Sequence, residues 1–326
     1  MATCLRVADY AAVLGKTADT EWALQLDVMP VEPVLVSQAG ELRQVNRLKN
    51  ADIVDPGMSF TGCLVAMLHK LLSQLSLQPD AAPVLLVLPE QLAGEQALAA
   101  VVQTLRQVFP ELLGHSACQL FPYGRSAALM AINAARQLLT AGESVVWIIG
   151  LDSPVSAMPV NEPSMAELTE YQISDNVIWS EGAVALALEQ STTGLRCHYL
   201  AADATVSSAT EELAIAQLFD AVAANTDSAL ARLYLPDNGS SELTACWQAH
   251  YPRLASCVEK STQLSLPAYS TGELGAAGGL YRFLHLYLAY SNANHKGLTL
   301  QCEISERIYR AVAVFSWQQA GSISEF

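Results

Sequence analysis

The sequence has little positive charge and no long hydrophobic segment. It carries 17 Lys and Arg against 32 Asp and Glu, which gives a formal net charge of −15. A chain this acidic, with scattered basic residues, repels phosphate backbones and anionic lipids, so we expect neither nucleic acid nor a membrane as a partner. Its longest apolar runs, such as "PVLLVL" and "SVVWII", are too short to span a bilayer. Since the N-terminus also lacks a basic stretch followed by an apolar one, we expect a cytoplasmic protein.

Cysteine pairs, metal-ligand spacings and dinucleotide motifs are missing as well. The seven cysteines are dispersed and none forms a CxxC pair, which favours reduced, mostly buried thiols. The six histidines show no metal-ligand spacing. The segment "GELGAAGG" lacks the GxGxxG spacing and the acidic strand end that NAD binding requires. We therefore expect no metal and no cofactor.

The chain is rich in short apolar runs that alternate with helical patterns. Of its 326 residues, 52% are hydrophobic, enough for a substantial core. Strands are predicted at "CLRVADY", "APVLLVLP", "SACQLFP", "SVVWIIG", "GAVALALEQ", "LRCHYLAADATV", "ALARLYLP", "STQLSLP", "GLTLQCEIS" and "YRAVAVFSW". Helices are predicted near 57–77, 93–108, 126–141, 209–224, 240–250 and 275–291. This alternation predicts an α/β protein with mainly parallel, mixed sheets that are buried on both faces.

The two parts of the chain resemble each other. "GRSAALMAINAARQLLTAGESVVWIIG" has a counterpart that begins with "STGELGAAGGLYRFLHLYLAY", and positions 125 and 272 are 147 residues apart. A repeat of this length indicates a duplicated α/β half. We predict an N-terminal half over 1–192 and a C-terminal half over 193–326, with 151–178 as a surface excursion that forms a cap. The Ala- and Gly-rich helices are apolar on nearly all sides and should lie together in the centre.

Arg125 is unusual for its position. It stands where the predicted helix over 126–141 opens, and a helix N-terminus carries partial positive charge. A cation there costs about 0.3–1 kcal/mol, so its placement calls for a compensating contact.

Three stretches give the sequence a resemblance to a known family. They are "GRSAALMAINAARQLLTAGESVVWIIG", "SEGAVALALE" (180–189, with Glu181 and Gly182) and "STGELGAAGG" (270–279). In them the chain resembles the thiolase superfamily, most closely the β-ketoacyl synthases, over about residues 55–317. The resemblance implies a five-layer αβαβα fold built from two similar halves.

Carried over residue by residue, the resemblance implies a loss of the catalytic residues. The position of the family's cysteine nucleophile falls on Arg125. The first histidine position falls on Asp237, or on Asn238 if the register slips by one, and the second falls on Gly272. The lysine that precedes the second histidine falls on Pro267, and the late glycine-rich phenylalanine loop is absent. A protein with these residues has lost the ketosynthase triad.

We expect Arg125 to fill the former active site, because a buried charge must be paired. The candidate partners are Asp237 and Glu273, and Asn238 completes this vestigial pocket. Ser126 is expected to serve as an N-cap or first-turn hydroxyl. The alternative is that Arg125 points into solvent or into a dimer groove.

Two candidate nucleophiles remain. Ser126 stands at the helix start, but no histidine lies in a matching motif to act as its base. Cys118 is the other, because "AC" in "HSACQLFP" matches the alanine–cysteine of ketosynthases. The helix aligns without a gap, however, and "ACQLF" alternates like a strand. We therefore expect Cys118 to be a small buried strand residue.

Three functions are compatible with these residues. The first is a catalytically inactive partner, scaffold or chaperone, similar to a chain-length factor or to an accessory protein of a bacterial secretion effector. It would form a homodimer through "SACQLFP", or a heterodimer with a ketosynthase, and its further partners would be an acyl carrier protein or an effector. The second is a module that binds acyl or pantetheine groups. The third is a rewired acyltransferase that uses Cys118 or an acid such as Glu273.

Overall fold

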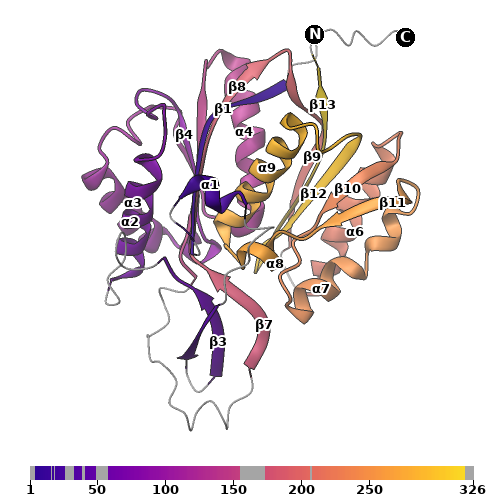
Figure 1. Cartoon of the computed structure of the whole chain (residues 1–326), viewed down its shortest axis with the longest axis horizontal. Helices are drawn as coiled ribbons and strands as arrows, with labels where there is room; N and C mark the ends of the chain where they lie inside the picture. Colours follow the sequence, from indigo (N-terminus) through magenta and orange to yellow (C-terminus); the bar gives the residue numbers. More distant parts are fainter. Residues whose placement is uncertain are drawn as a thin grey trace.

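In the computed structural model, residues 4–15, 17, 19–25, 33–38, 41–48, 58–154, 173–205 and 208–319 are described. A ten-stranded sheet runs through the protein (Figure 1). It consists of two five-stranded parts that meet at a single residue pair, Leu5 and Leu195. No helix among these residues is long and apolar enough to cross a bilayer.

The two parts of the sheet have the same topology. The first has the order β1-β8-β6-β4-β5, and the second has the order β9-β13-β12-β10-β11. In each part four strands run in one direction, and only β8 or β13 is reversed. The predicted duplication and the mainly parallel, mixed sheets are therefore confirmed. The first part comprises β1 (Cys4–Leu14), β4 (Val84–Val87), β5 (Gln119–Phe121), β6 (Val146–Asp152) and β8 (Gly182–Ser191). The second comprises β9 (Gly194–Ala204), β10 (Leu230–Tyr234), β11 (Val258–Ser265), β12 (Leu298–Ile304) and β13 (Tyr309–Gln318).

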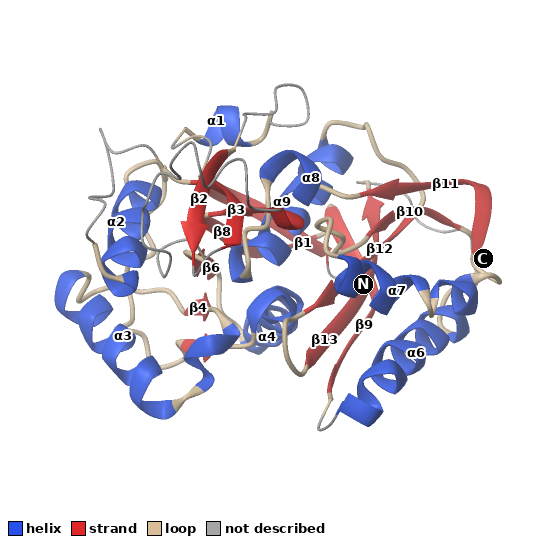
Figure 2. Cartoon of the chain, turned by 90° about the horizontal axis from the view of Figure 1, so that it is seen from below, coloured by secondary structure: helices blue, strands red, loops and turns tan. Residues whose placement is uncertain are grey.

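Helices arrange the sheet into five layers, which Figure 2 shows side by side. Helices α4 (Ala127–Ala141) and α9 (Ala276–Ser291) lie between the two parts of the sheet, in the largest apolar cluster. Helices α2 (Phe60–Leu72) and α3 (Glu95–Val108) cover the outer face of the first part. Helices α6 (Ser208–Ala224) and α7 (Ser241–Gln248) cover the second. The order of layers is αβαβα, as predicted.

Small residues let the two central helices approach each other. A Cβ atom on Gly279 of α9 would lie 2.4 Å from the carbonyl oxygen of Arg125 and 2.8 Å from the Cβ of Ala128. Such distances leave no room for a methyl group. The start of α9 therefore packs directly on the start of α4, where the candidate site lies.

A separate three-stranded sheet, which we call the arm, extends from the body (Figure 1). It consists of β2 (Val34–Gln38), β3 (Glu41–Asn46) and β7 (Ile173–Ser180), in the order β2-β3-β7. The prediction that 151–178 is an irregular excursion is wrong at both ends, because β6 reaches Asp152 and β7 begins at Ile173. Residues 155–172 lie outside the described residues.

Short helical turns complete the chain, and some predicted boundaries shift. The turns are α1 (Thr20–Ala23), η1 (Glu90–Ala93), η2 (Gly124–Ser126), η3 (Tyr251–Leu254) and α8 (Ala268–Thr271). Helix α2 begins after Ser59, whose hydroxyl accepts a hydrogen bond from the amide of Gly62. It ends at Leu72, five residues before the predicted end, and β5 keeps only three residues of the predicted "SACQLFP" strand.

Candidate functional site

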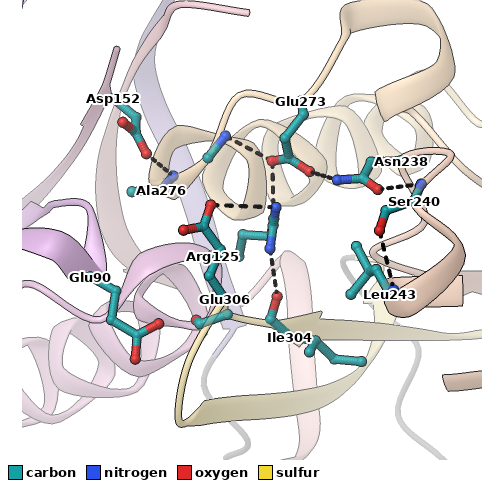
Figure 3. Close-up of polar contacts among 12 residues, drawn as sticks. Glu90, Arg125, Asp152, Asn238, Ser240, Leu243, Glu273, Ala276, Ile304 and Glu306 are labelled. Atoms are coloured by element: carbon teal, nitrogen blue, oxygen red, sulfur yellow. Dashed lines mark hydrogen bonds and ion pairs between the residues drawn. The ribbon is translucent and has the colours of Figure 1, made fainter. Parts of the chain in front are cut away.

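Arg125 lies in the η2 turn, directly before α4, and is buried. Only 5% of it is exposed, so the alternative in which it points into solvent is wrong. Its Nε lies 3.0 Å from Oε1 of Glu273, and its Nη1 donates a hydrogen bond of 3.2 Å to the carbonyl oxygen of Ile304 (Figure 3). Its Nη2 lies 3.9 Å from Oε1 of Glu306. The acceptors around the guanidinium compensate for its position at a helix N-terminus.

Glu273 is the buried partner of Arg125, and only 1% of it is exposed. Its Oε1 also accepts a hydrogen bond of 2.8 Å from the amide of Gly275, and its Oε2 accepts one of 2.6 Å from Nδ2 of Asn238. Burial by itself raises the pKa of Glu273, but Arg125, Arg282 and Asn238 together hold that pKa below its usual range. Glu273 is therefore ionised, and the pair carries a full charge on each side.

The backbone of Glu273 connects the site to the arm. Its amide donates to the carbonyl oxygen of Ile178, and its carbonyl oxygen accepts from the amide of Ser180. These bonds form a parallel bridge between Glu273 and Trp179 of β7. The position of the carboxylate is thus fixed by β7 as well as by α9.

Asp237, the other predicted partner of Arg125, is engaged elsewhere. It is 3% exposed, and its two carboxylate oxygens accept hydrogen bonds of 2.9–3.2 Å. The donors are the amide of Gly239, the hydroxyls of Thr244 and Tyr269 and the indole N–H of Trp247. The prediction of an Arg125–Asp237 pair is wrong, because these neutral donors hold Asp237 in the β10–α7 loop.

Asn238 is the residue of this loop that faces the site. Besides its bond to Glu273, its Oδ1 accepts a hydrogen bond of 3.0 Å from the amide of Ser240, which fixes the orientation of the side chain (Figure 3). Of the two alternatives for the first histidine position, the structure therefore places Asn238, and not Asp237, beside Glu273.

Gly272, at the predicted second histidine position, has no room for a side chain. Its φ is +75°, and a Cβ atom would lie 2.2 Å from Oγ of Ser180 and 2.8 Å from the carbonyl oxygen of Ile178. Strand β7 therefore occupies the space into which a side chain would project. Pro267, at the predicted lysine position, directly precedes α8.

Ser126 is at the N-cap position of α4, but it does not cap the helix with its side chain. Its Oγ lies 3.0 Å from the carbonyl oxygens of both Glu303 and Tyr309, to which it donates. Its amide donates to Oγ of Ser305. The predicted N-cap position is thus confirmed, but the hydroxyl makes no capping bond, because the β12–β13 hairpin covers the helix start and takes up both groups.

The β12–β13 turn is clamped on its other side by Glu90. The buried carboxylate of Glu90 accepts hydrogen bonds of 2.8 and 2.9 Å from the amides of Arg307 and Ile308. Ser305 donates a hydrogen bond of 2.6 Å to the carbonyl oxygen of Tyr123. This clamp brings Glu306, which is 39% exposed, beside Arg125. The sequence offered no signal for the roles of Glu90 and Glu306, because both depend on contacts between distant segments.

Cys118 is not part of this site. It precedes β5 and is partly buried, so the prediction of a buried strand residue is only approximate. Its Sγ accepts a hydrogen bond of 3.3 Å from the amide of Val84. Because β5 leads from Cys118 toward η2, the thiol lies at the opposite end of the strand from Arg125.

A cavity of about 300 Å³ opens beside the ion pair. Its wall includes Arg125, Trp179, Asn238, Ser240, Cys246 and Arg310. Among the described residues, no group of three or more His, Cys, Asp or Glu side chains is arranged to hold a metal ion. The polar groups suit hydrogen bonding to a small ligand.

Asp152, at the end of β6, is a further buried carboxyl group beside the site. Its Oδ2 accepts a hydrogen bond of 2.7 Å from the amide of Ala276, at the start of α9 (Figure 3). Burial raises its pKa to about 8, and the nearby carboxylates of Glu306 and Glu273 act in the same direction.

Replacing Asp152 by asparagine is expected to stabilise the protein most at alkaline pH. The folded state retains a proton that the unfolded state releases, so this group lowers the stability as pH rises from about 4 to about 8. Asparagine does not ionise. The gain in Tm of Asp152→Asn over the wild type should be small at about pH 5 and should grow toward about pH 8.5. The same change at exposed Asp227 is the control, and a gain independent of pH would contradict the prediction.

No protein-family model matches the sequence, and neither does any curated protein. Solved structures do match. The ishigamide ketosynthase/chain length factor is 16% identical, with a TM-score of 0.63 over 97% of this chain and 100% of that one. A type II polyketide synthase ketosynthase, solved in complex with its acyl carrier protein and bound to the hexaketide, is 13% identical, with a TM-score of 0.59 over 97% and 99%. Ketosynthase twelve of the bacillaene polyketide synthase from Bacillus amyloliquefaciens is 11% identical, with a TM-score of 0.62 over 97% and 73%.

The chain has the thiolase-like fold of ketosynthases. The resemblance predicted from the three sequence stretches is thus confirmed at the level of the fold. At these identities the match does not extend to function, so the function must be argued from the ketosynthase-like site itself.

Proposed function

We propose that this protein is a non-catalytic ketosynthase-like partner, which acts by binding another protein and not by condensing acyl groups. The observation that carries the proposal is the buried Arg125–Glu273 ion pair at the start of the central helix. In an active ketosynthase this position needs a thiolate, and a guanidinium remains protonated and is no nucleophile. Gly272 and Asn238 supply no imidazole either.

A partner role also agrees with the edge of the large sheet, which is formed by β5. Among the strands that the structure describes, β5 is at one end of the ten-stranded sheet and pairs with β4 alone. One of its three residues is the half-buried Leu120. Together with Leu98, Ala99 and Val102 of α3, Leu120 lines an apolar groove. An edge of this kind is a template for pairing with a second chain. One of the similar solved structures is a ketosynthase/chain length factor, which supports a ketosynthase-like partner.

The first test is acylation. Incubated with acyl-CoA or with an acyl carrier protein loaded with an acyl group, the protein should gain no stoichiometric adduct in intact-mass spectra. A ketosynthase-directed cysteine inhibitor should not label it either. An active ketosynthase, treated in parallel, is the positive control. An adduct on Cys118 would overturn the proposal and favour the rewired acyltransferase.

The second test is assembly. We expect a dimer with the β5 strands of two chains antiparallel across the twofold axis. Light scattering at micromolar concentration should give the mass of a dimer, and Leu120→Lys on β5 should reduce it to that of a monomer. The matched control is Leu264→Lys on β11, the opposite edge strand, where Leu264 is 49% exposed. A monomeric wild type would exclude a homodimer, and co-purification with a ketosynthase would then test the heterodimer.

A second candidate function is favoured by the cavity beside Arg125. A volume of about 300 Å³ at the lower end of the range for ligand pockets suits a short acyl or pantetheine group. A binding module of this kind would bind the acyl or pantetheine group without catalysing a condensation. Saturable binding of pantetheine, abolished by Ser240→Trp at the cavity wall, would support this function over a purely structural one.

A further inference from the structure

A second cavity, of about 450 Å³, lies at the end of the C-terminal half that faces away from the candidate site. Its wall comes from the end of α9, from the segments that lead into β10 and β12 and from the end of β13. Asn238 and Ile304 lie at the opposite ends of β10 and β12. The residues of its wall that matter here are Ser228, Tyr290, His295, Lys296, Ser316 and Trp317. The proposed function makes no use of them.

The charge of this cavity is opposite to that of the protein. The chain has 32 acidic residues against 17 basic ones, yet none of the described residues that line the cavity is Asp or Glu. Lys296 supplies an ammonium group at its edge, and Arg232 lies close enough to act on the titration of His295. A local positive field in an acidic protein favours an anionic ligand.

An aromatic wall faces the same space. The rings of Tyr290 and Trp317 are stacked, with centroids 6.3 Å apart and planes inclined by 11°. Tyr287 supports the indole edge-on at 5.5 Å. The Tyr290 hydroxyl is fixed by Gly297 and Thr299, at 2.8 and 2.7 Å. Tyr290 is only 2% exposed, so it supports Trp317 from the interior. The half-buried indole of Trp317 is therefore the flat surface that a planar ligand can reach, and it is held in place at little entropic cost.

His295 is held in a defined orientation between this cavity and the interior. Its Nε2 lies 2.9 Å from the hydroxyl of Tyr234, which lies 2.8 Å from Nδ1 of His285 in α9. Burial lowers the pKa of His295, and Arg232 and His285 lower it further. The imidazole is therefore neutral in the empty cavity, and a bound carboxylate would favour its protonation.

We propose that this cavity binds a planar aromatic carboxylate, with the ring against Trp317 and the carboxylate beside Lys296 and His295. The flat indole favours a planar ligand. Lys296 favours an anion, because none of the described residues that line the cavity is acidic. The site is independent of the Arg125 pocket, because the two lie at opposite ends of β10 and β12.

The test is a titration of the full chain with three probes of similar size, followed by NMR at the indole N–H of Trp317, which Trp317→Phe assigns. Benzoate carries both features, benzamide lacks the charge and cyclohexanecarboxylate lacks the ring. Benzoate should give a saturable shift with a Kd of about 1 mM or below. The other two should bind at least about fivefold more weakly, and benzoate should raise the pKa of His295.

Two lysine variants distinguish binding in this cavity from non-specific attraction of an anion to surface lysines. Lys296→Gln, at an exposed position, should weaken benzoate binding about two- to fivefold and leave benzamide binding unchanged. Lys260→Gln, at an exposed position on β11, should leave both unchanged. The proposal is overturned if benzoate gives no saturable shift at about 10 mM, if the three probes bind equally, or if the two lysine variants behave alike.

Discussion

Replacing Arg125 by alanine should lower the free energy of unfolding by about 3–5 kcal/mol. The loss arises because the buried Glu273 would keep hydrogen bonds from the neutral donors Asn238 and Gly275 only, with Arg282 as the remaining nearby cation. The carbonyl oxygen of Ile304 would also lose its donor. Denaturant unfolding of the wild type and the variant measures the difference. A buried pair adds little over an apolar replacement of both partners, so most of this loss reflects the charge left behind.

The double variants identify the partner. Arg125→Ala with Glu273→Ala should recover part of the loss, whereas Arg125→Ala with Asp237→Ala should add a second loss, because Asp237 serves a separate network. If both double variants behave alike, or if Arg125→Ala leaves the Tm unchanged, the ion pair does not hold the site together. Arg125→Cys should not restore condensation, because no histidine reaches the pocket.

Gly272→Ala should destabilise the protein by about 2–5 kcal/mol. The φ of +75° disfavours any other residue, and the added Cβ would meet Ser180 and Ile178 of β7, which the arm holds in place. Gly94→Ala is the matched control: its φ is −74°, and a Cβ there meets nothing within 4 Å. This control should change the stability by less than about 1 kcal/mol.

If Gly272→Ala lowers the stability no more than Gly94→Ala does, β7 can move away at little cost in free energy, which would contradict this prediction. The position would then be open to a larger residue. In the structure as it stands, Gly272→His meets the same obstacle with a larger side chain. A histidine therefore cannot be returned to this position without moving β7.

Sequence patterns were sufficient to locate the ten strands of the large sheet. Most of these strands are apolar enough to stand out from the helices around them, whereas the polar edge strand β11, "VEKSTQLS", was located only in its second half. The three strands of the arm were missed. Strands β2 and β3 are short and rich in polar residues, and β7, "ISDNVIWS", pairs in parallel with β3 across more than a hundred residues of chain. A strand that depends on such a distant partner carries little local signal.

In the site, too, residues in local motifs could be predicted, whereas residues placed by contacts between distant segments could not. Glu273 and Asn238 could be proposed as neighbours of Arg125, because they belong to motifs with known places in the fold. Choosing Glu273 over Asp237 required the side-chain geometry, since both carboxylates lie in loops at the same end of the sheet. Glu306 and Glu90 could not be found at all, because their positions depend on the packing of the β12–β13 turn against η1.

The ion pair also joins the duplicated parts of the protein. Arg125 comes from the turn before α4 and Glu273 from the turn before α9, which occupy equivalent places in the two repeats. A fragment that ends between β8 and β9 would thus keep a cation without its counterion, and the complementary fragment would keep the anion. Each fragment keeps one member of the pair without its direct partner, so we expect neither to fold stably alone, whereas co-expression of both should reconstitute the fold.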